Sequence, residues 1–152
     1  MQIKQSGITI IESLVGLSIL SFIIVFIFYT MNLYFTASAM LLRDTKATYL
    51  AEEGQEFARF MRDSNWTTFS GLSTTTTYYF AVTSSSISAT TTPQVIDSLY
   101  TRSFTLQFTK RNGSNDLVES GGSNDSSGRV ATVNVVWGAE SVQLKSVLEN
   151  LN

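Results

Sequence analysis

One apolar run dominates the sequence: it extends from Ile8 to Leu42, and Glu12 is its only charged residue. About 20 consecutive apolar residues cross a bilayer as a helix, and residues 13–35 supply that length. A carboxylate inside such a segment is costly to insert, so it is by default a functional residue that needs a partner. The run therefore predicts a membrane helix that carries one functional charge.

The partner of Glu12 does not lie within the apolar run, which contains no Lys, Arg or His. Three candidates are the preceding Lys4, a lipid headgroup and a group on another molecule. A fourth arises if the chain is cleaved after Gly7, because the new amine of Ile8 would then lie four residues before Glu12. A short N-terminal segment that keeps Lys4 on the cytoplasmic side agrees with the enrichment of Lys and Arg in the cytoplasmic segments of membrane proteins.

Residues 1–7 form a short polar leader that contains Lys4 and ends in Gly7, and Glu12 is the fifth residue after that Gly. This pattern resembles the N terminus of type IV prepilins and of the pseudopilins of type II secretion systems. In that family a membrane prepilin peptidase cleaves after the Gly and methylates the new N-terminal amine. The resemblance implies cleavage between Gly7 and Ile8, N-methylation of Ile8, and a role for Glu12 in assembly. Ile8 stands where the family usually has Phe or Met.

Two other interpretations account for the apolar run. A secretory signal peptide would end in a small-residue cleavage site such as Ala37-Ser38-Ala39, but its apolar region is only about 7 to 15 residues long. A plain single-pass anchor fits the length and leaves Glu12 without a purpose. The resemblance to prepilins accounts for both the length and the charge.

The composition excludes several kinds of chemistry. The 152-residue chain has no Cys and no His, so it offers no thiol nucleophile, disulfide, zinc site or imidazole base. It contains neither a Gly-x-Ser-x-Gly nor a Walker motif, and we expect no enzyme activity and no cofactor. The net charge of -2 provides no basic field for nucleic acid. We interpret the local pair Lys110-Arg111 as a solvated turn.

After Leu42 the sequence becomes polar but keeps a helical period. Small and apolar residues recur there at steps of three and four: Ala47, Leu50, Ala51, Gly54, Phe57, Ala58 and Met61. No Pro interrupts residues 8–63, so we expect one long helix whose second half is amphipathic and packs on a head domain. We expect the helix to end at Ser64-Asn65. The carboxylates of this half are expected on its solvated face: Glu52, Glu53 and Glu56.

Residues 64–152 are expected to form a small antiparallel head. Alternation of apolar and polar residues predicts its strands, which lie near residues 77–82, 102–110, 130–137 and 141–148. Two polar stretches are expected to be loops: a Ser/Thr-rich one at residues 73–92, which flanks the apolar residues 78–82 of the first strand, and a Gly/Ser/Asn-rich one at residues 112–128.

Two further expectations concern side chains of the head. Trp137 ends an alternating strand, and we expect its ring to pack on the helix at Phe57 and Met61. Three acidic residues of the second loop are candidate calcium ligands, namely Asp116, Glu119 and Asp125. Their spacing matches no EF-hand loop, so we expect no metal.

The expected fold is α+β and pilin-like, a long N-terminal helix packed on a small antiparallel sheet. The expected function is that of a structural subunit of a type IV pilus-like filament. Major pilins often carry a helix-breaking Pro and Gly in the membrane half, whereas this chain has no Pro there, which favours a minor subunit. A type II secretion pseudopilin and a single-pass membrane-anchored adhesin or adaptor remain alternatives.

The resemblance also implies partners and a location. The expected partners are a prepilin peptidase, other pilin subunits, and the extension ATPases and platform proteins of a pilus or secretion machinery. The precursor would sit in the cytoplasmic membrane with its leader inside. The mature subunit would then enter an extracellular or periplasmic filament.

Overall fold

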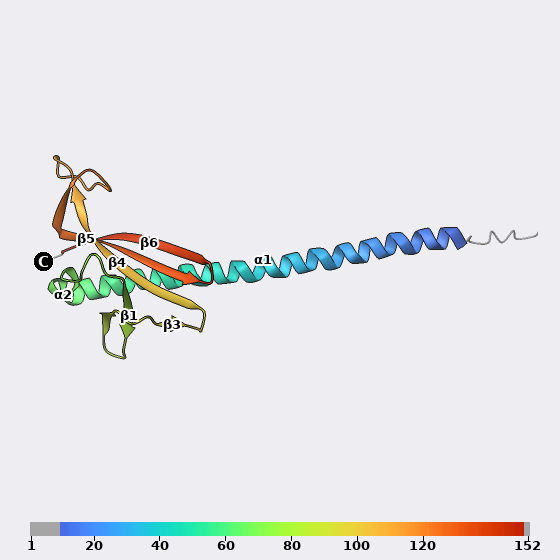
Figure 1. Cartoon of the computed structure of the whole chain (residues 1–152), viewed down its shortest axis with the longest axis horizontal. Helices are drawn as coiled ribbons and strands as arrows, with labels where there is room; N and C mark the ends of the chain where they lie inside the picture. Colours follow the sequence, from blue (N-terminus) through green and yellow to red (C-terminus); the bar gives the residue numbers. More distant parts are fainter. Residues whose placement is uncertain (1–9, 151–152) are drawn as a thin grey trace, which may run out of the picture. The chain divides into compact units, whose positions relative to one another are not determined.

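The computed structural model describes residues 10–150. The chain divides into two compact units, with the boundary between Arg43 and Asp44. Helix α1 (Ile10–Ser64) contributes to both units, and the second unit also contains a sheet (Figure 1). The long helix, the amphipathic second half and the stop at Ser64 are therefore confirmed.

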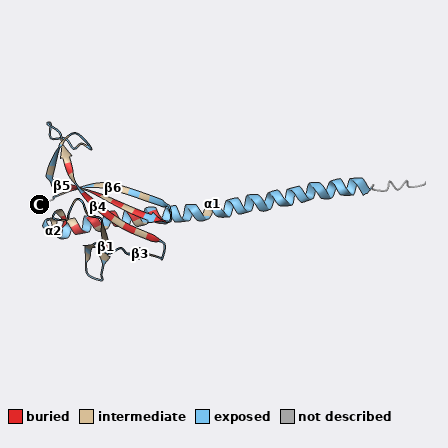
Figure 2. Ribbon diagram, in the orientation of Figure 1, coloured by how far each residue is buried: buried red, intermediate tan, exposed pale blue. Residues whose placement is uncertain are grey.

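The first unit consists of the apolar part of α1, which is long and apolar enough to cross a membrane. None of its described residues is buried (Figure 2). Its large apolar side chains from Ile10 to Leu42 are between 45% and 79% exposed. Such a surface is stable only against lipid or against other apolar helices.

The second unit, which we call the head, packs the rest of α1 against an antiparallel sheet of order β2-β1-β4-β5-β6, with β3 paired to β4. The short helix α2 follows α1, and Asn65 caps it by accepting a hydrogen bond from Thr68 N. The bounds of these elements are α2 (Trp66–Ser70), β1 (Tyr78–Val82), β2 (Ile87–Thr90), β3 (Val95–Ile96), β4 (Tyr100–Arg111), β5 (Ser123–Trp137) and β6 (Glu140–Glu149).

The core lies between α1 and one face of the sheet (Figure 2). The helix presents mainly small side chains there, whereas the strands supply larger ones. A Cβ added at Gly54 would lie 2.7 Å from Val133 Cγ1 and 3.4 Å from Phe80 Cε2, so the two layers meet closely at this position. The buried apolar residues include Ala47, Ala51, Ala58, Phe80, Phe104, Leu106, Ala131, Val133 and Val135.

The four predicted strands are confirmed as β1, β4, β5 and β6, but both predicted loops contain additional strand. β2 and β3 were missed because each is short and lies in or beside the Ser/Thr-rich stretch. β5 begins at Ser123, inside the predicted second loop, and its pairing with β4 shifts register between Phe108 and Thr109. A Cβ at Gly128 would lie 2.7 Å from Thr109 Oγ1, so this irregularity requires a glycine.

The predicted burial of Trp137 is confirmed, since its exposed fraction is only 7%. Its ring neighbour is Tyr100, with the centroids 6.0 Å apart. The Phe57 ring instead meets Phe80 edge-on at 5.6 Å. The expected ring contact between Trp137 and Phe57 is therefore wrong, because Trp137 pairs with Tyr100 and Phe57 pairs with Phe80.

Substitution of Gly54 tests the close approach of helix and sheet. Alanine ordinarily stabilises a helix by about 1 kcal/mol relative to glycine, but here the new methyl group overlaps Val133. Overpacking costs about 1–3 kcal/mol and the helix gain of about 1 kcal/mol offsets part of it, so we expect Gly54→Ala to lower the free energy of unfolding by up to about 2 kcal/mol. Denaturant unfolding of fragment 44–152, which contains every buried core residue, measures it.

Gly113→Ala is the matched control, because nothing lies within 4 Å of a Cβ at Gly113. It should unfold like the wild type. A Gly54→Ala fragment that is more stable than the wild type by the full helix gain of about 1 kcal/mol would contradict the close packing.

Candidate functional site

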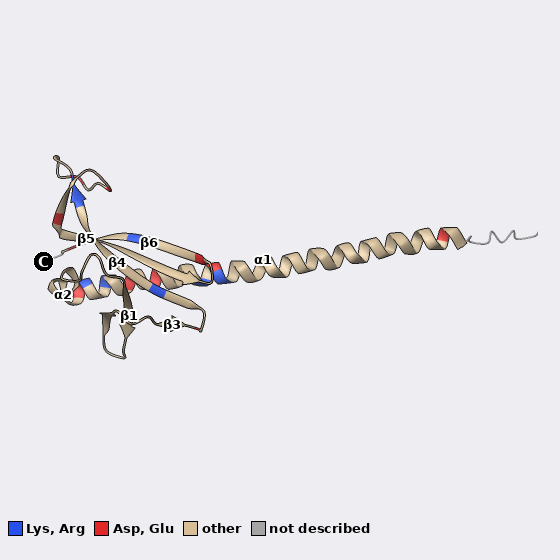
Figure 3. Ribbon diagram, viewed as in Figure 1, with Lys and Arg blue, Asp and Glu red and all other residues tan. Residues whose placement is uncertain are grey.

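Glu12 lies in the first turn of α1. Figure 3 shows that this acidic position is the only charge on the apolar part of the helix. The side chain is exposed, and it has no hydrogen-bond or ion-pair partner among residues 10–150. Glu12 is thus a carboxylate on an apolar surface that no residue between Ile10 and Asn150 neutralises.

The other polar side chains of the apolar part differ from Glu12, because several of them bond to the helix itself. Ser18 Oγ donates to Val15 O at 2.8 Å, and Ser21 Oγ donates to Leu17 O at 2.8 Å. Thr30, Asn32 and Thr36 donate to backbone carbonyls three or four residues earlier in the same way. Such bonds allow a polar side chain to face lipid without an external partner.

The predicted cleavage and methylation positions, Gly7 and Ile8, lie outside the described residues. The same holds for the rest of the leader. Their proposed roles therefore remain predictions.

Two polar side chains join α1 to the sheet inside the head. Gln55 is buried; its Nε2 donates to Leu144 O at 2.8 Å, and its Oε1 accepts from Ser146 Oγ at 2.5 Å. Arg102 is also buried and donates from Nη1 to Leu50 O at 3.0 Å and to Glu53 Oε2 at 2.5 Å. Buried polar groups are costly unless bonded, so these contacts fix the position of the helix on the sheet.

Arg129 joins α2 to the sheet. Its guanidinium lies over the Phe108 ring at 4.3 Å and donates from Nη2 to Ser70 O at 2.8 Å. Burial lowers the pKa of Arg129 from its ordinary value, because desolvation disfavours the charged form. Its Nε is buried and finds no partner in the part of the chain that the structure describes.

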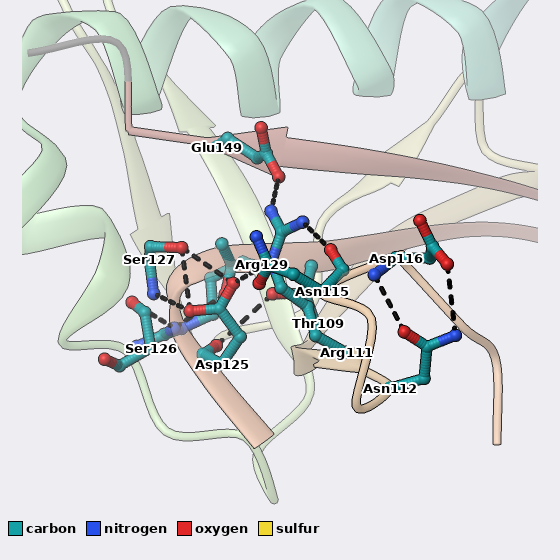
Figure 4. A network of polar contacts seen from close by, with 11 residues as sticks. Thr109, Arg111, Asn112, Asn115, Asp116, Asp125, Ser126, Ser127, Arg129 and Glu149 are labelled. Atoms are coloured by element: carbon teal, nitrogen blue, oxygen red, sulfur yellow. Dashed lines mark hydrogen bonds and ion pairs between the residues drawn. The ribbon is translucent and has the colours of Figure 1, made fainter. Parts of the chain in front are cut away.

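A polar cluster at the base of the β4–β5 hairpin is centred on Arg111 (Figure 4). Arg111 Nε donates to Asp125 Oδ2 at 2.7 Å, Nη2 to Glu149 Oε1 at 2.5 Å, and Nη1 to Asn115 O at 3.0 Å. Asp125 Oδ1 also accepts from Ser127 N at 2.8 Å. These bonds tie three segments of the head together: β4, β5 and the end of β6.

The candidate calcium ligands are not brought together. Asp125 is bonded to Arg111 and Ser127, whereas Asp116 accepts from Asn112 Nδ2 at 3.3 Å (Figure 4). Glu119 lines the groove on the sheet to which Lys110 and Lys145 also contribute. Across the described residues there is no group of three His, Cys, Asp or Glu that could hold a metal ion.

The interpretation of Lys110-Arg111 as a solvated turn is wrong, because both residues belong to β4. Arg111 enters the polar cluster. Lys110 lines a groove of about 570 Å³ on the sheet, together with Gln107, Val130, Lys145 and Val147. We call this the outer groove. Sequence reasoning missed it, because its residues come from three strands and a loop.

Comparisons of the chain with protein-family models, with curated proteins and with solved structures give no match.

The polar cluster predicts an acid-sensitive contribution to head stability. Hydrogen bonds from Arg111 and from Ser127 lower the pKa of Asp125 from 3.8 to about 2. A carboxyl group with a lowered pKa stabilises the folded state above its unfolded pKa, and this stabilisation is lost as pH falls through the folded pKa. We therefore expect the free energy of unfolding of fragment 44–152 to fall between about pH 4 and pH 2, and to fall less steeply in Asp125→Asn.

Glu140→Gln provides the control, since Glu140 is exposed and has no ion-pair partner among the residues described. Its pH profile should follow that of the wild type. Parallel profiles for Asp125→Asn and wild type below pH 4 would show that the cluster does not contribute in this way.

Proposed function

We propose that this chain is a structural subunit, of the minor kind, of a type IV pilus-like filament. The observation that carries the proposal is Glu12, a carboxylate in the first turn of an apolar helix that has no partner among the described residues. The sequence pattern of leader, Gly7 and Glu12 supports the same function by its resemblance to prepilins.

The exposed apolar helix needs a cover, which lipid provides before assembly and the helices of neighbouring subunits provide afterwards. Apolar contact alone defines register poorly in such a bundle, because the lipid is as apolar as the side chains. A buried charge that must be paired does define register. We propose that the free amine of Ile8 in a neighbouring subunit pairs with Glu12 when the helices pack.

The proposal assigns the remaining steps by analogy with the family. A prepilin peptidase would cleave after Gly7 and methylate Ile8, and an assembly ATPase with its platform protein would extract the subunit. The precursor would reside in the cytoplasmic membrane, and the head would be displayed on an extracellular or periplasmic filament.

Two alternatives use the same helix. A type II secretion pseudopilin would be processed identically but assemble with a secretion machinery. A single-pass anchored adhesin or adaptor would retain its leader, so an intact N terminus in the mature protein would support it. Mass spectrometry of the N-terminal peptide from native membranes separates the processed forms from the anchored one.

Gly7→Val tests processing. The peptidase must accommodate the residue that precedes the cut, and a branched side chain should block it. We expect the variant to remain in the membrane as an uncleaved precursor, detected by its larger mass and unmethylated Ile8. Normal shortening of the Gly7→Val chain would remove the prepilin argument.

Glu12→Leu tests assembly separately from processing. Cleavage and insertion depend on Gly7 and the apolar run, so the variant should still be shortened and inserted. It should nevertheless enter filaments far less than the wild type in a strain that lacks the native copy, as measured by immunoblotting of sheared filaments. Glu12→Asp keeps the charge with a shorter reach and should give an intermediate amount.

Ser18→Ala is the matched control, because the Ser18 hydroxyl bonds to its own helix and its loss should leave incorporation unchanged. Incorporation of Glu12→Leu at the level of wild type would exclude the pairing with Ile8.

A further inference from the structure

The sheet has a second face, opposite α1, that is rich in side chains able to form hydrogen bonds. Phe104 and Leu106 of β4 are buried toward α1, so the residues between and beside them point to the other side. We call this side the outer face. Its cross-strand neighbours follow from the register and form two rows: Thr90, Tyr79, Ser103, Asn134 and Gln143, and then Thr105, Thr132 and Lys145.

The outer groove continues the outer face toward the β4–β5 hairpin. Gln107, Val130 and Val147 are neighbours across three strands and form its floor. Leu117 lines it from the hairpin loop. The groove floor thus combines two valines with one amide side chain, and ligand sites likewise combine apolar surface with placed polar groups.

Two lysines line this groove, Lys110 and Lys145. Neither has an ion-pair partner among residues 10–150, although five other cations of the head do. Those five pair with carboxylates: Lys46 with Asp97, Arg59 with Glu56, Arg62 with Asp63, Arg102 with Glu53, and Arg111 with Asp125 and Glu149. Glu119 also lines the groove and forms no ion pair with either lysine among the described residues. The groove therefore carries two positive charges and one negative charge, and both lysines are available to an anionic ligand.

We propose that the outer face and outer groove bind an anionic polysaccharide, that is, a chain of polyhydroxylated rings that bears carboxylates. Hydroxyl and amide side chains held on a rigid sheet suit a ligand with many hydroxyl groups. Tyr79 adds a half-exposed ring with a polar tip in the same row. Lys110 and Lys145 supply the attraction for the carboxylates.

Other anionic polymers fit this surface less well. A peptide that adds a strand to a sheet needs a free strand edge, whereas the outer face presents side chains from strands such as β5 that are paired on both sides. Nucleic acid needs a more basic surface than two lysines on a chain of net charge -2. The proposal does not depend on filament assembly, since α1 covers only the other face.

The test uses the full chain in detergent micelles and immobilised polygalacturonate, a carboxylated polysaccharide. Fully methyl-esterified polygalacturonate removes the charge and keeps the rings, and polyglutamate keeps the charge without the rings. We expect saturable binding to polygalacturonate that weakens with added salt, weaker binding to the ester, and little binding to polyglutamate.

Lys110→Gln/Lys145→Gln should weaken binding to polygalacturonate about tenfold, because two exposed ion pairs are lost. Tyr79→Ala should weaken binding to both polysaccharides. The control Arg59→Gln/Arg62→Gln also removes two positive charges, but from α1, and should leave binding unchanged. Thermal unfolding checks that all variants are folded. The proposal is overturned if polygalacturonate does not bind saturably, if the double lysine variant binds like the wild type, or if polyglutamate binds equally well.

Discussion

The close approach between α1 and the sheet is the constraint on which the head depends. Gly54 leaves no room for a methyl group against Val133, and the neighbouring helix positions Ala47, Ala51 and Ala58 are fully buried. Small residues let the two layers come near enough for Gln55 and Arg102 to reach backbone and side-chain partners across the interface. Larger side chains on this face of α1 would move Gln55 and Arg102 away from their partners, and buried polar atoms without partners are costly. The small residues and the polar contacts therefore support one another.

Much of this fold could be predicted from the sequence because it is encoded in periodicity. The step of three and four along residues 47–61 predicted the packed face of α1, and the alternation at residues 130–137 predicted the inward face of β5. The short strands β2 and β3 were not predictable in this way. Each has too few residues to show a period, and their pairing with β1 and β4 stabilises them rather than their own sequence.

The candidate sites also differ in whether a local sequence pattern reveals them. Glu12 was apparent from the sequence, because a single charge in an apolar run is a local pattern. The polar cluster and the outer groove were not, since Arg111, Asp125 and Glu149 are distant in sequence and meet only through strand register. The acidic residues of the second predicted loop looked like one group in sequence and are three separate environments in the structure.

Arg111 also separates two parts of the head with different tolerance to change. Its guanidinium bonds to the paired strands at Asp125 and Glu149, and to the hairpin loop at Asn115 O. Its bonds to Asp125 and Glu149 hold the base of the hairpin independently of the residues at the tip. The tip is therefore the region where insertions and sequence divergence can accumulate without disturbing the core. Related chains can therefore vary this surface, including the wall of the outer groove that Leu117 forms, and keep the same scaffold.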